Sequence, residues 1–229
     1  MPHRLPLVFA HGNGIPRPVY QKMLIGLSHR FIATGVDRLG HDPSYPVTDA
    51  WPRLLDQLRA HVTAIGEPVT LLGHGSGGWL ALLAAYRMPE RVRAVILLDA
   101  PLPTVAQARL LRLAKRIGLA RLPVWLCGVG QERADLDPEC QMLYRRFGCR
   151  GQDAAPPGAP DARRFDPGVS RRLRETYPTD LAALVAGGPP VDGSGRVVPC
   201  GILVGKRSLA TRFCGLAASR QLAGAHLLR

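Results

Sequence analysis

The stretch that decides the fold of this chain runs from Val69 to Trp79 and reads VTLLGHGSGGW. Residues 69–72 predict a short strand that is buried on both faces. A glycine-rich turn follows over residues 73–78, and residues 79–87 predict a helix that ends before Pro89. A strand, a sharp turn and a helix in this order predict one unit of an α/β sheet.

Similar units stand on both sides of this stretch. Further buried strands are predicted over residues 5–10, 31–36, 92–98 and 197–204. Helices are predicted over residues 19–28, 51–65, 110–119, 167–185 (with a break near Pro178) and 211–222. The helix that opens at Trp51-Pro52 has Asp49 as its expected N-cap and Gly66 as its expected end. Strands that alternate with helices in this way predict an α/β fold, a mostly parallel sheet with helices on both faces.

One segment interrupts this alternation. Residues 120–165 are rich in glycine and proline and show no periodicity, so we expect an irregular cap or lid-like insert that is the least ordered part of the chain. The sequence therefore divides into 1–119, the first part of the core, 120–165, the insert, and 166–229, the rest of the core. A divergent cap and an altered sequence would both look like this segment.

Net charge and cysteine content limit the kinds of partner and binding site that we expect. The chain of 229 residues has a net charge of +13, but its basic residues are scattered and only 6% of its residues are aromatic. This pattern predicts no specific nucleic-acid site and indicates a compositional bias instead. The five cysteines show no CxxC spacing, so neither a zinc site nor a disulfide framework is expected. Oligomeric state is left open.

Membrane and secretion signals are not expected either. No apolar run reaches the roughly 18 residues that a membrane-spanning helix needs. The first residues lead directly into a strand and do not look like a signal peptide, so we expect a cytoplasmic protein.

At the 69–79 stretch the sequence resembles the α/β-hydrolase superfamily, in particular its bacterial members. The resemblance rests on the stretch itself and on four further motifs: HGN at 11–13, GHDPSYPVTDAW at 40–51, PERV at 89–92 and FDP at 165–167. It implies the α/β-hydrolase fold with a nucleophile elbow at the turn. It also implies serine-based hydrolysis of small esters or related acyl compounds, with no metal or organic cofactor.

The nucleophile position is irregular. The family elbow reads Gly-x-Ser-x-Gly, and without a gap it falls on residues 73–77, which places the nucleophile position at Gly75. In that frame the backbone N–H groups of Ser76 and Asn13 form the oxyanion hole, and Gly75 should take a positive φ. A frame shifted by one residue would make Ser76 an alternative nucleophile.

The other triad positions are irregular too. By resemblance the acid should stand at Ser208, where the chain has serine, or else at Asp99, which is otherwise a loop or helix-capping residue. His226 resembles the final histidine, although the sequence leaves almost no room for a last strand before it and the C-terminal end looks incomplete. His41 and His61 are expected to be a loop residue and an exposed helix residue.

These irregularities predict an α/β-hydrolase homologue of the ester or acyl-bond class whose activity is impaired because Gly75 replaces the serine. The alternative is a non-catalytic homologue that acts as a binding protein. A structure of the elbow separates the two frames, because it shows which residue stands at the apex of the turn.

The charge gives a prediction of its own. Scattered arginines should bind nucleic acid only weakly and without sequence preference, because binding would come from counterion release alone. Fluorescence anisotropy with two unrelated DNA duplexes should give similar affinities that disappear at high salt. Binding that prefers one duplex and persists at high salt would contradict this expectation.

Overall fold

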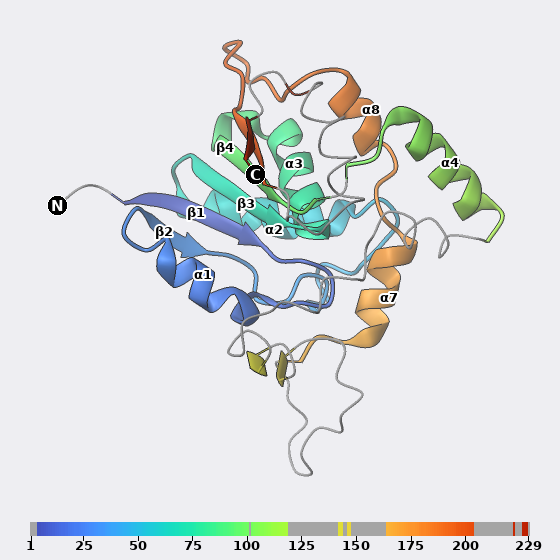
Figure 1. Ribbon diagram of the computed structural model, residues 1–229, viewed down its shortest axis with the longest axis horizontal. Coiled ribbons are helices and arrows are strands. Elements are labelled where there is room, and N and C mark those ends of the chain that lie inside the picture. Colours follow the sequence, from blue (N-terminus) through green and yellow to red (C-terminus); the bar gives the residue numbers. More distant parts are fainter. Residues whose placement is uncertain are drawn as a thin grey trace.

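The computed structural model describes residues 4–100, 102–118, 142–143, 146–147, 164–203, 222 and 226–228. These residues form a six-stranded sheet in the order β2-β1-β3-β4-β5-β6, and each neighbouring pair is parallel (Figure 1). The strands are β1 (Leu5–Ala10), β2 (Phe31–Thr34), β3 (Val69–His74), β4 (Val92–Leu98), β5 (Cys200–Leu203) and β6 (His226–Leu228). The predicted parallel α/β fold is therefore confirmed.

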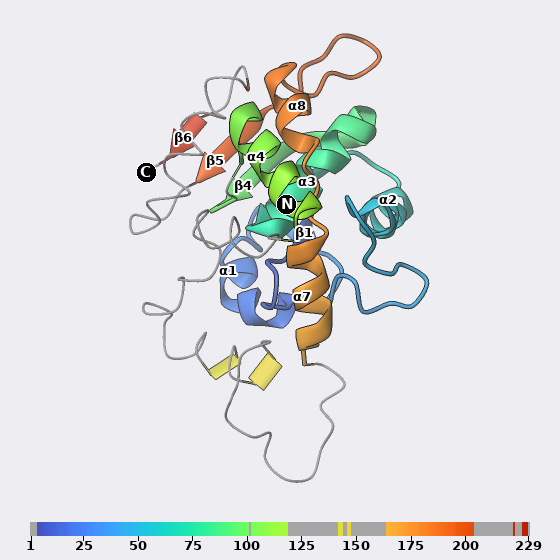
Figure 2. The same ribbon diagram turned by 90° about the vertical axis from the view of Figure 1, so that its right-hand side faces the viewer.

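Helices cover both faces of this sheet. They are η1 (Arg17–Tyr20), α1 (Gln21–Gly26), α2 (Pro52–Ile65), α3 (Ser76–Arg87), η2 (Pro89–Arg91), α4 (Val105–Arg116), α7 (Pro167–Glu175) and α8 (Leu181–Ala186). Figure 2 shows α1 on one side of the strands and α2 and α3 on the other. The inner strands β1 and β3 are thus buried on both faces, whereas the edge strand β2 is partly exposed.

The two faces of β1 explain this arrangement. Successive side chains of a strand point to opposite faces, so Leu7 and Phe9 pack with Leu24 of α1. Val8 and Ala10 belong to the larger core on the other face, which contains α2 and α3. A strand buried on both sides needs mainly apolar residues, and this is why β1 and β3 are mainly apolar.

Some boundaries differ from the sequence-based expectations. Helix α3 begins at Ser76, inside the predicted turn, and α4 has its N-cap at Thr104, ahead of the predicted start. The sequence leaves almost no room for a last strand before His226, and the short strand β6 that does form has His226 itself as its first residue. The predicted helix at 211–222, apart from Leu222, and most of the 120–165 insert lie outside the described residues.

The start of α2 is a clear correction. Asp49 is not the N-cap; Trp51 takes that position with φ +60°, and Ala50 before it has φ +58°. Tertiary contacts hold this unusual backbone, because the Ala50 N–H donates to the Thr176 carbonyl (2.9 Å) and Trp51 Nε1 donates to the Thr176 hydroxyl (3.1 Å). The preference of Asp49 for the N-cap position is therefore overridden here by contacts with a segment about 125 residues away.

Glycine packing between β1 and α3 gives a stability prediction. A Cβ atom at Gly77 would collide with the carbonyl groups of Ala10 and His11, whereas a Cβ atom at Gly26 of α1 would meet nothing within 4 Å. We expect Gly77→Ala to lower the free energy of unfolding by about 3 kcal/mol or more. Gly26→Ala is the matched control and should leave stability unchanged or raise it by up to about 1 kcal/mol.

Urea unfolding followed by circular dichroism measures both variants. Equal midpoints for the two substitutions would show that the contact between α3 and the end of β1 is not tight.

Candidate active site

The turn between β3 and α3 has the geometry of an elbow with Gly75 at its apex. Gly75 has φ +52° and ψ −118°, a backbone state that glycine tolerates far better than any other residue. Its N–H donates to the Leu98 carbonyl (2.9 Å), and its own carbonyl accepts from the Gly78 N–H (3.0 Å). The predicted positive φ at Gly75 is confirmed, and both ends of the residue are fixed by the backbone.

The direction of the missing side chain at Gly75 is informative. A Cβ atom built there meets no atom within 4 Å, whereas one at Gly78 would lie 2.6 Å from the Ala100 Cβ. One at Gly73 would collide with the backbone of Gly77. The neighbouring glycines are therefore required by close packing, and only Gly75 faces open space. A side chain at this position would project away from the core.

The loop after β1 lies beside this elbow and is held by His11. The imidazole is buried; its Nδ1 donates to the Gly12 carbonyl (2.9 Å) and its Nε2 accepts from the Leu39 N–H (2.7 Å). These two bonds require the neutral ring, because a backbone carbonyl only accepts and a backbone N–H only donates. Burial lowers the pKa of His11 from 6.5 to about 4. His11 therefore positions the loop and is not available as a base.

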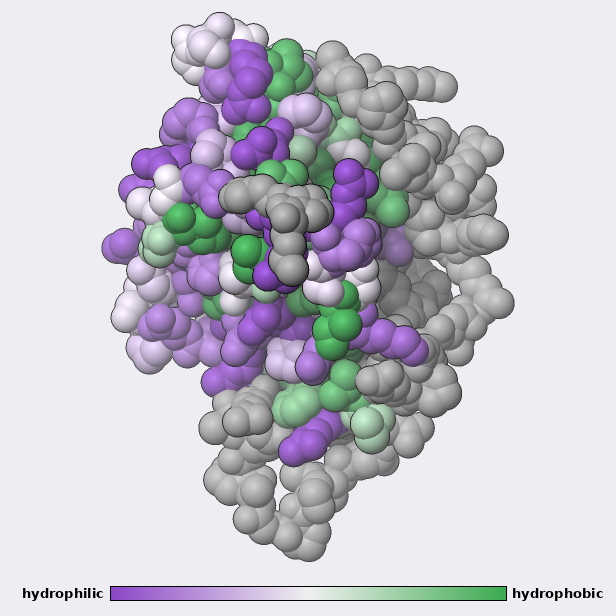
Figure 3. Space-filling view, turned by 90° about the vertical axis from the view of Figure 1, so that its left-hand side faces the viewer, coloured by the Kyte–Doolittle hydropathy of each residue, from purple (hydrophilic) through white to green (hydrophobic). Residues whose placement is uncertain are grey.

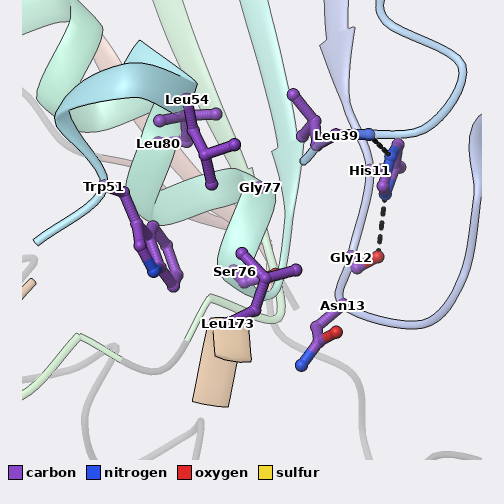
Figure 4. A pocket seen from close by; sticks show the side chains of 10 residues that line it. All are labelled: His11, Gly12, Asn13, Leu39, Trp51, Leu54, Ser76, Gly77, Leu80 and Leu173. Atoms are coloured by element: carbon purple, nitrogen blue, oxygen red, sulfur yellow. Dashed lines mark hydrogen bonds between the residues drawn. The ribbon is translucent and has the colours of Figure 1, made fainter. Parts of the chain in front are cut away.

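A pocket lies between this loop and the start of α3. Its empty volume is about 230 Å³, part of it open to solvent, and it is lined by His11, Gly12, Asn13, Leu39, Trp51, Leu54, Ser76, Gly77, Leu80 and Leu173. Figure 4 shows the loop residues His11, Gly12 and Asn13 facing Ser76 and Gly77 across it. The structure thus brings together Asn13 and Ser76, the two predicted oxyanion-hole residues.

Helix α3 contributes electrostatics to the pocket. Ser76 is its first residue, and the first N–H groups of a helix have no partner within that helix. They also carry the positive end of the helix dipole, which favours a developing negative charge. The side chain of Asn13 is turned toward α7, where its Nδ2 donates to the Ser170 carbonyl (3.0 Å). This bond links the loop to the opposite wall of the pocket.

His41 and Phe165 join two distant motifs around the same loop. Nε2 of His41 accepts from the Asp166 N–H (2.9 Å), and Nδ1 donates to the Leu39 carbonyl (3.2 Å). The ring of Phe165 is buried and meets the rings of His11 and His41 edge-on, at centroid distances of 5.6 and 4.4 Å. Burial lowers the pKa of His41 as well. The expected loop position of His41 is confirmed, and its role is to tie the GHDP and FDP segments together.

Two other histidines also have neighbours. His74 shares a hydrogen bond with the Tyr20 hydroxyl (2.8 Å) on the α1 side of the sheet. His61 was expected to be exposed, but it is half-buried and its Nε2 lies 3.1 Å from the Thr34 hydroxyl. That expectation was wrong because α2 lies close enough to β2 for the ring to reach it.

Asp99 directly follows β4 and has φ +41°, which is unusual for a residue with a side chain. Its N–H donates to the Leu203 carbonyl (2.9 Å). Because Gly75 bonds to Leu98, Asp99 stands next to the elbow at the carboxyl edge of the sheet. It does not cap α4, whose N-cap is Thr104 in a capping box with Gln107, so the helix-capping alternative is wrong. The role of Asp99 as the acid stays a prediction.

His226 lies on a strand and not in a loop. In the sheet register, Leu98 pairs with Leu203 and Leu203 pairs with Leu228, whereas His226 pairs with Gly201. His226 is therefore two residues short of the level reached by the other strand ends, or about 7 Å along the strand. Its role as the base stays a prediction, and Ser208 lies outside the described residues.

The apolar wall of the pocket was not predicted from the sequence. Trp51, Leu54 and Leu80 come from α2 and α3, and Leu173 comes from α7. No local pattern in the sequence tells which apolar residues of different helices will meet at a pocket. Among the described residues, no group of three or more potential metal ligands lies together, and no helix is long and apolar enough to cross a membrane.

Comparisons with known proteins agree with this geometry. The Alpha/beta hydrolase family model matches residues 7–227. A putative non-heme haloperoxidase of Mycobacterium phage D29 is 33% identical over 105 residues, which are 42% of this chain and 36% of the phage protein. The chain therefore matches only about a third of the length of this curated relative.

Solved structures show the same fold at low sequence identity. MenH from S. aureus superposes with a TM-score of 0.64 and 17% identity, over 98% of this chain and 84% of MenH. The enol-lactonase from Burkholderia xenovorans LB400 gives a TM-score of 0.62 and 17% identity, over 99% of this chain and 82% of the lactonase.

The lowered pKa of His11 predicts a pH-dependent stability. Unfolded chains take up a proton on this residue near pH 6.5, whereas the folded protein does so only near pH 4. The free energy of unfolding should therefore be highest above pH 6.5 and fall by about 3 kcal/mol toward pH 4, with His41 adding in the same direction.

Urea unfolding across this pH range tests the point. His29→Gln removes an exposed histidine and is the control for the substitution itself, whereas His11→Gln should lower stability at neutral pH and flatten the slope. A wild-type curve that is flat between pH 6.5 and pH 4 would contradict the neutral, buried His11.

Proposed function

The chain belongs to the alpha/beta hydrolase family, and from this premise we propose that it binds small ester-like or acyl compounds at the elbow with its serine chemistry impaired. The observation that carries the proposal is Gly75. It stands at the apex with the backbone conformation and the outward direction that suit a nucleophile, but it has no side chain to attack with.

The parts around Gly75 support binding of a carbonyl group. Asn13 and Ser76 line one pocket, and Ser76 opens α3 at the positive end of its dipole. A carbonyl oxygen held by backbone N–H groups of these two residues would be polarised, which favours slow attack by water. Leu80, Leu173 and Trp51 provide an apolar wall for the rest of the ligand.

The hydrogen bonds of the histidines near the pocket also favour low activity, because they leave few candidates for a base. Both ring nitrogens of His11 and of His41 are bonded to backbone groups, and His74 bonds to Tyr20 on the other face of the sheet. By resemblance to the family, His226 is the proposed base and Asp99 the proposed acid. A hydroxyl without a positioned histidine is a poor nucleophile at neutral pH.

Ser76 is the alternative nucleophile, because it lines the pocket. As the first residue of α3 it stands one position beyond the apex, so its side chain leaves the backbone in a different direction from that of Gly75. The other alternative is a binding protein with no turnover at all. Both alternatives predict a different pattern of activities in one set of variants.

An activated aryl ester distinguishes these cases. We expect wild-type turnover to be on the order of a millionfold below that of a serine enzyme of this fold, because triad members act as a unit. It should still exceed the rate in water by up to about a thousandfold, from carbonyl polarisation alone. Gly75→Ser should restore little, although open space at that position accommodates the side chain.

Three further variants complete the set. Ser76→Ala and His226→Ala should each leave the slow rate nearly unchanged, and Ser28→Ala removes an exposed serine as the control. Fast wild-type turnover that Ser76→Ala and His226→Ala both abolish would overturn the impaired state and identify Ser76 as the nucleophile. A large gain from Gly75→Ser alone would show that a working base is present.

The proposed location is the cytoplasm, because the cysteine spacing in the sequence shows no disulfide framework. Cys200 is a buried free thiol in β5, and burial raises its pKa to about 12, so it is a protonated core residue. Free thiols persist in reducing compartments.

A further inference from the structure

Helix α4 has three distinct faces. Ala108, Leu111 and Ala114 point into the protein and are buried. A second, exposed row consists of Leu110 (60% exposed), Leu113 (54%) and Ile117 (60%). Their spacing i, i+3, i+7 places them on one face, next to the buried face. These are three of the eight large hydrophobic residues that are exposed among the described part of the chain, and they form one stripe.

A cationic stripe runs beside the apolar one. Arg109, Arg112 and Arg116 have the same i, i+3, i+7 spacing, offset by one residue, and all three are exposed. The helix reads VAQARLLRLAKR and contains no acidic residue. Its one other cation, Lys115, faces the body of the protein, where it pairs with Asp49 and donates to the Tyr177 carbonyl (3.2 Å). The outer face of α4 therefore combines arginines with aliphatic side chains and has no counter-charge of its own.

We propose that α4 is a peripheral membrane-binding helix that docks on an anionic lipid bilayer. In the bound state Leu110, Leu113 and Ile117 enter the boundary between headgroups and acyl chains. Arg109, Arg112 and Arg116 meet the lipid phosphates. An interfacial helix of this kind needs an apolar face next to a cationic one, and its affinity comes from both.

The charge and the apolar character of α4 favour a lipid bilayer over other binding partners. A second copy that packed its own α4 against this one would bring two sets of three arginines together, which is unfavourable. Single-stranded nucleic acid would use the arginines, but leucine and isoleucine side chains give no ring on which bases stack. An anionic bilayer offers phosphates to the arginine stripe and acyl chains to the apolar stripe, so it satisfies both at once.

The position of α4 in the fold suits docking. Its inner face is fixed by Leu111 in the core, by Lys115 over the Tyr177 ring (5.0 Å), and by packing against α8. It follows the carboxyl end of β4, the edge of the sheet that carries Gly75 (Figures 1 and 2). The opposite side of the molecule shows mainly hydrophilic residues with small, separate hydrophobic groups where it is described (Figure 3). Docking would therefore bring the elbow edge to the bilayer.

Sedimentation with vesicles tests the proposal on the full chain. We expect binding to phosphatidylcholine vesicles that contain phosphatidylglycerol, and much weaker binding to pure phosphatidylcholine or at high salt. Arg109→Gln/Arg112→Gln should weaken binding about thirtyfold, since each arginine near an anionic surface contributes roughly fivefold. Leu110→Gln/Leu113→Gln should weaken it by about a hundredfold.

Two matched control variants replace the same kinds of side chain on other parts of the surface. Arg30→Gln/Arg93→Gln deletes two exposed charges at the amino edge of the sheet, and Ile25→Gln/Ile32→Gln replaces two exposed aliphatic residues of α1 and β2. Both controls should bind vesicles within about threefold of wild type, and circular dichroism should show that all four variants are folded.

Other outcomes overturn the proposal. Equal losses in the arginine pair and its control would show non-specific attraction by the net charge. Unchanged binding of the leucine pair would show that the apolar stripe does not enter the bilayer. A dimer in solution that the leucine pair abolishes, with no vesicle binding by wild type, would assign the stripe to a second copy.

Discussion

The structure depends on one close contact, the approach of the turn after β3 to the end of β1. Gly77 has no room for a side chain, because its Cβ would collide with the backbone at the end of β1, and a Cβ at Gly73 would collide with the backbone of Gly77 itself. This contact places the first residue of α3 beside the loop that begins at His11, so the helix dipole and the loop face one pocket. Gly75 is then fixed at the apex from both sides by backbone bonds.

The loop that completes the pocket is held by residues far from it in sequence. His11 bonds to Leu39, His41 bonds to Asp166, and Phe165 packs against both imidazoles. Each ring is in the neutral state that its backbone partners require. The HGN, GHDP and FDP motifs are thus parts of one buried assembly, and their residues serve mainly to position the backbone.

Strained backbone is concentrated around the same region. Ala50, Trp51 and Asp99 are the non-glycine residues with positive φ among those described. Trp51 lines the pocket and Asp99 adjoins the elbow. Strain of about 1–3 kcal/mol per residue persists only where surrounding contacts enforce it, and it is commonly found at functional sites. This clustering supports the elbow edge as the candidate functional part of the molecule.

The sequence alone determined the parallel sheet, the position of the elbow and the positive φ at Gly75. Buried strands and tight turns have local signatures, namely continuous apolar runs and glycines at fixed spacing. Tertiary structure decided the rest. Trp51 caps α2 in place of Asp49 because Thr176 holds the Ala50 N–H and the Trp51 indole. His226 lies within β6 because it pairs with Gly201, which fixes its position along the strand. Pairing between distant segments cannot be recognised from local residue spacing. The pocket wall also unites residues from α2, α3 and α7 that no periodicity connects, since only folding brings those three faces together.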